Sequence, residues 1–103
     1  MKKFKIEWSN KARIDFQNHF SFILNVSYDA AKDFADKMYQ SITSLEVFPQ
    51  RFSTFDMCKM ISCYDFRKMI VNNRYIVIYG VSNEYVKILR ILDARKKFET
   101  LID

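Results

Sequence analysis

The chain has 103 residues, of which half are apolar and 17% are aromatic, and its formal net charge is +5 with a pI near 9.3. This length and composition suit one compact domain, residues 1–103, with a real hydrophobic core, and the sequence contains no low-complexity stretch. No apolar run approaches the roughly 18 residues that a membrane span requires, and the basic N-terminus lacks the apolar stretch of a signal peptide. We therefore expect a soluble cytoplasmic protein.

The first expected elements are a strand and a helix. Apolar and charged residues alternate over residues 4–8, which is the period-two pattern of a half-buried strand. Ser9 or Asn10 can cap a following helix, because a short polar side chain accepts the free N–H groups of the first turn. Apolar residues recur three or four positions apart from Ala12 onward, which predicts a helix over about residues 11–25.

A second helix is predicted over about residues 30–47, again from apolar residues three or four positions apart. Asp29 is its candidate cap, and Pro49 ends it because the residue before a proline is pushed out of the α region. The break between the two helices is short, so we expect them to fold back as an antiparallel hairpin. His19 is expected at the border of this hairpin, as a structural residue rather than a catalytic one.

The remainder of the chain has the pattern of a β-meander. Residues 50–56 read as a loop, and Asn72-Asn73 is a tight-turn signal because asparagine tolerates positive φ. Runs rich in β-branched and aromatic residues predict three antiparallel strands at residues 64–71, 75–81 and 85–92. Residues 93–102 are expected to form a short C-terminal helix or tail.

The expected order is therefore β-α-α-β-β-β, an α+β fold of two layers in which a helical hairpin packs on a mainly antiparallel sheet. The first strand joins this sheet. We expect the hairpin to cover one sheet face and the arginines of the closing strands to gather on the other.

Basic residues are concentrated in the last third of the chain. Between Phe66 and Phe98 there are eight Lys or Arg residues and only two acidic ones, Glu84 and Asp93. Such an excess attracts polyanions or an acidic protein partner, although an ordinary solvated face has the same composition. The candidate surface for an anionic partner consists of Arg67, Arg74, Arg90, Arg95 and Lys96.

No metal or cofactor is expected. The two cysteines, Cys58 and Cys63, match no common zinc spacing, and on a strand they would point to opposite faces. We expect two reduced thiols.

Several segments in order resemble the RelE/ParE toxin superfamily, with a match over about residues 5–97. The similar segments are Ile6-Glu7-Trp8-Ser9-Asn10-Lys11-Ala12, the helix end Ile42-Thr43-Ser44-Leu45-Glu46-Val47-Phe48-Pro49, and the three strands that contain Phe66-Arg67-Lys68-Met69-Ile70-Val71, Arg74-Tyr75-Ile76-Val77-Ile78-Tyr79 and Val86-Lys87-Ile88-Leu89-Arg90-Ile91-Leu92. An arginine near the start of one strand and an Arg-Tyr pair opening the next form the most specific part of the resemblance.

The resemblance implies the toxin of a bacterial type II toxin–antitoxin system, of the kind used in plasmid stabilisation. Its partner would be a cognate antitoxin whose flexible segment folds onto the toxin, and operator DNA would be bound only through the antitoxin complex. In the ParE-like branch the target is DNA gyrase and no hydrolytic site is needed. In the RelE-like branch the toxin is a ribosome-dependent mRNA endoribonuclease.

The side chains favour the ParE-like branch. RNA cleavage without a metal needs a general base and a general acid, and the candidates are Asp93, Tyr64 and Tyr75, with Tyr79 as a further possible acid. Asp93 stands where ParE-like and many related toxins carry a histidine, and Arg95 beside it should lower its pKa. The catalytic set is left unknown, and two alternatives stay open: a RelE-like ribonuclease and a degenerate, non-toxic binding module.

Overall fold

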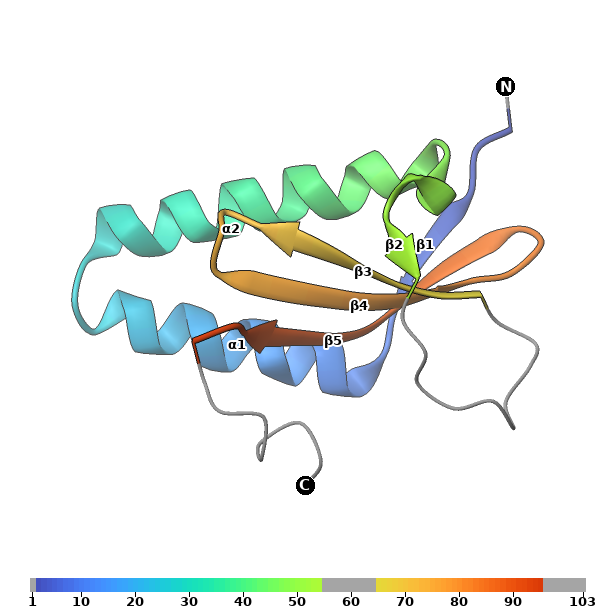
Figure 1. The fold of residues 1–103 in the computed structure, drawn as a ribbon. Helices are drawn as coiled ribbons and strands as arrows, with labels where there is room; N and C mark the ends of the chain where they lie inside the picture. Colours follow the sequence, from blue (N-terminus) through green and yellow to red (C-terminus); the bar gives the residue numbers. More distant parts are fainter. Residues whose placement is uncertain (1, 55–64, 96–103) are drawn as a thin grey trace.

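The computed structural model describes residues 2–54 and 65–95 and contains the predicted first strand, two helices and three-strand meander, in the predicted order (Figure 1). The helices are α1 (Asn10–Leu24) and α2 (Tyr28–Thr43), followed by two 3-10 turns, η1 (Ser44–Glu46) and η2 (Pro49–Arg51). The strands are β1 (Lys5–Trp8), β2 (Ser53–Thr54), β3 (Asp65–Val71), β4 (Tyr75–Val81) and β5 (Tyr85–Asp93). Tyr64, Lys96, both cysteines and the predicted C-terminal helix or tail beyond Arg95 lie outside the described residues.

The strands of this described part form one mixed sheet in the order β1-β5-β4-β3-β2. β3, β4 and β5 make the predicted antiparallel meander, whereas β1 pairs parallel with β5. The turn between β3 and β4 has φ values of 56° at Asn72 and 54° at Asn73, as the Asn-Asn signal indicated. The α+β architecture is thus confirmed, with an antiparallel majority and one parallel pair.

Serine side chains begin both helices. Ser9 Oγ accepts the Ala12 N–H at 3.0 Å, and Ser27 Oγ accepts the Ala30 N–H at 3.1 Å. The prediction of Asp29 as the second cap was wrong by two residues, because α2 begins at Tyr28 and Asp29 lies in its first turn. There its carboxylate still interacts favourably with the helix dipole.

The second helix is shorter than predicted, and the segment after it is more ordered than a loop. α2 ends at Thr43, η1 continues the same direction, and η2 and β2 occupy part of residues 50–56. The chain reverses at Phe48, whose φ of 47° lies in the left-handed region. The fully buried Tyr79 fixes the reversal, since its hydroxyl donates a 2.6 Å hydrogen bond to the Pro49 carbonyl.

The core lies between the helical hairpin and one face of the sheet. Its helix side comes from the predicted apolar stripe of α2, and its sheet side from alternate residues of β3, β4 and β5. The residues buried there are Ala12, Phe34, Met38, Ile42, Leu45, Met69, Val71, Tyr75, Val77, Tyr79, Val81, Val86, Ile88 and Ile91. No helix within residues 2–54 and 65–95 combines the length and apolarity needed to cross a membrane.

Candidate functional site

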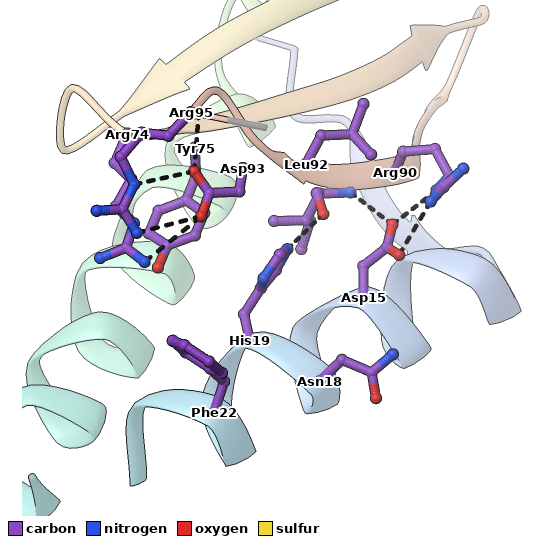
Figure 2. Close-up of a pocket in the computed structure, with 11 residues that line it drawn as sticks. Asp15, Asn18, His19, Phe22, Arg74, Tyr75, Arg90, Leu92, Asp93 and Arg95 are labelled. Atoms are coloured by element: carbon purple, nitrogen blue, oxygen red, sulfur yellow. Dashed lines mark hydrogen bonds and ion pairs between the residues drawn. The ribbon is translucent and has the colours of Figure 1, made fainter. Parts of the chain in front are cut away.

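A pocket of about 680 Å³ opens between α1, the turn from β3 to β4 and the end of β5 (Figure 2). Three of the predicted surface arginines line it, together with polar and aromatic side chains of α1. The lining residues are Asp15, Asn18, His19, Phe22, Arg74, Tyr75, Arg90, Ile91, Leu92, Asp93 and Arg95.

Helix α1 forms one wall of the pocket, and its side chains hydrogen-bond to the edge of β5 where a neighbouring strand would otherwise do so. β1 ends at Trp8, so the outer edge of β5 beyond Ile88 is no longer paired with it. Asp15 accepts the Ile91 N–H at 2.9 Å, and His19 Nε2 donates to the Ile91 carbonyl at 2.8 Å. These two side chains lie one helical turn apart, so a single face of α1 satisfies both backbone groups of Ile91.

Arg90 is fixed to that same wall. Its Nε and Nη2 donate to the two carboxylate oxygens of Asp15 at 2.7 and 3.2 Å, a bidentate pair (Figure 2). The hydrogen bond with Asp15 raises the pKa of Arg90 despite partial burial, and the nearby negative charge raises it further. Arg90 is therefore a charged but internally neutralised group.

On the opposite wall two arginines share one carboxylate. Arg74 Nη2 lies 3.4 Å from Asp93 Oδ2, and the Arg95 guanidinium lies 3.4 and 3.5 Å from the two Asp93 oxygens. The Arg95 backbone N–H also donates to Asp93 at 3.0 Å. Burial raises the pKa of Asp93, but the hydrogen bonds from Arg95 and the charges of both arginines outweigh burial and leave the pKa lowered.

The contacts of Arg74 and Arg95 with Asp93 are long, and one carboxylate does not use all the N–H groups of two guanidinium groups. Within the described residues, Arg74 Nε is buried and has no hydrogen-bond partner. The same guanidinium lies over the ring of Tyr75, 5.1 Å from its centroid. A carboxylate held at 3.4 Å by two cations is a loose arrangement compared with the 2.7 Å contact of Asp15.

The structure does not bring Arg67 to this pocket. Arg67 Nε pairs with Asp65 at 2.9 Å, and Nη1 donates to the carbonyls of Gln50 and Phe52 at 2.8 and 2.7 Å. Its side chain has the same strand parity as the buried Met69, so it points to the helix side and ties η2 and β2 to the sheet.

The expectation that the arginines gather on the sheet face away from the helices was therefore wrong. Arg74, Arg90 and Arg95 do converge, but on the side of α1. At Arg90 the physical reason is a register shift between Ile78 and Tyr79 in the pairing of β4 with β5. Such a bulge re-aims the neighbouring side chain, and Arg90 thereby reaches Asp15.

His19 has the structural role expected at the border of the hairpin, through its hydrogen bond to Ile91, but it also reaches the basic end of the sheet. Its ring lies 5.2 Å from that of Tyr75 and belongs to the pocket. The signal that could have located it was the i, i+4 spacing of Asp15 and His19, two polar groups beside the apolar stripe of α1.

The pocket offers cations but a poor set of proton carriers. Tyr75 is only 3% exposed, and burial raises its pKa, with Arg74 partly opposing the rise. Asp93 is a weakened base because its pKa is lowered, and His19 Nε2 is engaged with the backbone. Among the described residues no three His, Cys, Asp or Glu side chains are grouped to hold a metal ion. Anion binding suits this arrangement better than proton transfer.

Comparison with known proteins fits this fold and pocket. The family model described as "ParE toxin of type II toxin-antitoxin system, parDE" matches residues 6–98, which include every residue that lines the pocket. The chain belongs to the ParE toxin family. No curated protein matches this ParE-family chain in sequence.

A solved structure described as the chromosomal ParDE TA system from P. aeruginosa shares the fold of this ParE-family toxin. The TM-score is 0.69 at 13% sequence identity, and the match covers 88% of this chain and 96% of that chain. The similarity thus extends over nearly the whole of both domains.

Proposed function

We propose that this ParE-family protein is a cytoplasmic toxin that inhibits DNA gyrase without a nucleolytic step and is neutralised by a cognate antitoxin. The effector surface consists of Arg74, Arg90 and Arg95, together with Lys96, which follows Arg95 in the sequence. Operator DNA is bound only through the complex with the antitoxin. The described ParDE system of P. aeruginosa supports the assignment of an antitoxin partner.

The observation that carries the proposal is the chemistry at the end of β5. A ribonuclease needs a free acid and a free base beside its cations. Here Asp93 lies between two guanidinium groups, its pKa is lowered, and the hydroxyl of Tyr75 is harder to ionise than usual. This arrangement favours binding to a large target over RNA cleavage.

One observation favours a second candidate, an mRNA endoribonuclease. His19 shares the pocket with three arginines and lies beside Tyr75, so an imidazole is present where a phosphate could be held. In this case Nδ1 of His19 would act as the base, because Nε2 is the ring atom that donates to the Ile91 carbonyl.

The test is induction of the protein in a naive bacterial host, followed by plasmid topology and mRNA analysis. We expect growth arrest with loss of negative supercoiling, and inhibition of purified gyrase in a supercoiling assay. Arrest with cleaved mRNA and normal supercoiling would establish the ribonuclease instead. Absence of arrest at verified expression of folded protein would leave the binding-module alternative.

A charge-reversal variant links the effect to the pocket. Arg95 is 64% exposed at its side chain, so Arg95→Glu should leave the fold intact while weakening gyrase inhibition by about tenfold or more. Arg13→Glu, on the exposed surface of α1 outside this pocket, is the matched control. Equal inhibition by the two variants would remove the pocket from the effector surface.

A further inference from the structure

The pocket has more hydrogen-bond donors than its own carboxylates use. Arg74 and Arg95 together satisfy one carboxylate, that of Asp93, at distances of 3.4 to 3.5 Å. A guanidinium has five N–H groups, and Arg74 Nε remains buried without a partner among the described residues. Within the described residues, Asp93 is contacted by Arg74 Nη2 and by Arg95 Nε and Nη2, so further N–H groups of the two guanidinium groups are left for an acceptor that enters the pocket.

The charges that line the pocket indicate the charge of an anion that it can bind. Arg90 and Asp15 neutralise each other in a close bidentate pair. Arg74, Arg95 and Asp93 leave one positive charge, since two cations share one anion. A single carboxylate or another monoanion balances this excess, and the planar carboxylate matches the fork geometry of a guanidinium.

The α1 surface that adjoins these arginines is uncharged and carries several exposed apolar side chains. Phe22 projects from α1 at the pocket, and the residue is 67% exposed (Figure 2). From there to the end of the hairpin, residues 18–28 contain no Lys, Arg, Asp or Glu. Val26 and Tyr28 are 81% and 69% exposed, and the connection between α1 and α2 extends beyond the strands (Figure 1).

We propose that the pocket and the adjoining hairpin form a docking site for one acidic side chain carried by an otherwise apolar segment of a partner protein. The carboxylate binds between Arg74 and Arg95, and the apolar neighbours of that acidic residue pack on Phe22. This inference depends on the proposed function in one respect only: the partner is a protein.

A nucleic acid is the less suitable occupant. Polyanions are bound by rows of cations that follow successive phosphates. Here the described pocket residues provide one net positive charge, and the next surface along α1 is uncharged over residues 18–28. One charge beside exposed apolar side chains is instead the pattern of a protein–protein anchor.

The test uses the isolated toxin and small probes, so that its outcome does not depend on gyrase or on an antitoxin. The probe is 4-phenylbutyrate, which joins a carboxylate to an apolar ring, and its amide is the neutral match. We expect saturable NMR shifts of the Nε–Hε signals of Arg74 and Arg95 and of the Phe22 amide. The amide should bind about tenfold more weakly, because a charge-assisted hydrogen bond is lost.

Matched variants separate the site from general charge. Arg95→Gln and Arg74→Gln should each reduce the affinity for 4-phenylbutyrate by about tenfold. Arg13→Gln removes the same charge from an exposed position of α1 next to Trp8 and should have no effect. Phe22→Ala should weaken 4-phenylbutyrate binding but leave acetate binding unchanged. Arg95 is mostly exposed, so its variant remains informative if the Arg74 variant does not fold.

Two outcomes would overturn the proposal. Equal binding of the acid and the amide would show that the arginines do not select a carboxylate. Tighter binding of a short single-stranded oligoribonucleotide at the same arginine signals, with a strong dependence on salt, would make the pocket a nucleic-acid site. If the toxin binds the carboxylate but does not inhibit gyrase, the result would instead contradict the proposed target and would still support the docking site.

Discussion

The two ends of the sheet use arginine in opposite ways. At the start of β3, Arg67 is 17% exposed at its side chain, and its contacts with Asp65, Gln50 and Phe52 are 2.7 to 2.9 Å long. At the other end, Arg74 and Arg95 share Asp93 at 3.4 to 3.5 Å, and one buried nitrogen of Arg74 lacks a partner in the described structure. At the first end, groups of the same chain accept the hydrogen bonds of Arg67. At the second end, N–H groups of Arg74 and Arg95 are left for another molecule.

This difference shows why a cluster of basic residues in a sequence does not define a binding surface. Arg67 lies near the start of β3 and Arg74 lies just beyond its end, seven positions later in the sequence. What separates them is the number of backbone carbonyls and carboxylates that the fold places within reach of each guanidinium. Four predictions test this contrast, beginning with the largest expected effect.

Replacing Arg67 should be the most damaging of these changes. Arg67→Met leaves the carbonyls of Gln50 and Phe52 and the carboxylate of Asp65 without their donor, so we expect the free energy of unfolding to fall by about 3 kcal/mol. Arg95→Met is the control and should change it by less than about 0.5 kcal/mol. Urea denaturation measures both. Similar losses for the two variants would abolish the contrast between the ends of the sheet.

Removing Asp15 should have the next largest effect. Asp15→Ala leaves Arg90 and the Ile91 N–H unpaired at the edge of β5, and the expected loss in unfolding free energy is about 2 kcal/mol. The matched control is Asp33→Ala, which breaks the exposed Asp33–Lys37 pair of α2 and should cost about 0.5 kcal/mol or less. Hydrogen exchange of the Ile91 amide should accelerate only in the Asp15 variant.

The buried hydroxyl of Tyr79 should contribute less. Tyr79→Phe removes the hydrogen bond to Pro49 and should cost about 1 kcal/mol in unfolding free energy. Burial raises the pKa of Tyr79 to about 12 from 10.0. Its contribution is therefore complete below pH 10 and is lost as the pH rises through about 12. As the pH rises above 10, the free energy of unfolding should fall less for Tyr79→Phe than for the wild type. An identical fall in both proteins would contradict the assignment.

The smallest expected effect is the acid dependence that Asp93 contributes. Although burial raises its pKa, the hydrogen bonds from Arg95 and the two cations lower it below 3.8. A lowered pKa gives stability that is present above the ordinary value of 3.8 and is lost as the pH falls through the folded value. Asp93→Asn should therefore lose less stability between neutral and acidic pH than the wild type, as urea midpoints across pH will measure. A steeper loss of stability at acidic pH in Asp93→Asn than in the wild type would contradict a lowered pKa of Asp93.

Most of the fold could be predicted because its signals are local. The alternation before Trp8, the apolar stripe of α2 and the Asn72-Asn73 turn each concern neighbouring residues, and the structure confirms the elements they predicted. The site was less accessible. Arg74, Arg90, Asp93 and Arg95 were identified as candidates, but not that they meet beside α1.

The parts that were wrong or not predicted depend on contacts between distant segments. His19 was expected to be a structural residue at the border of the hairpin, and its hydrogen bond agrees with that, but its partner Ile91 is 72 positions away and its place in the pocket was not predicted. Arg67 was grouped with the other arginines, and its partners Gln50 and Phe52 come from a segment expected to be a loop. The i, i+4 spacing of Asp15 and His19 marks one face of α1, but no sequence pattern identifies the partner of His19 or the partners of Arg67.

The sequence by itself determined the order of helices and strands, the buried faces and the concentration of positive charge, because hydrophobic periodicity and turn propensity act over a few residues. Only the tertiary structure decided which charges are neutralised. The free capacity of a guanidinium depends on the acceptors that packing brings within about 3 Å of it, and here α1 supplies Asp15 to Arg90 while Arg74 and Arg95 must share Asp93.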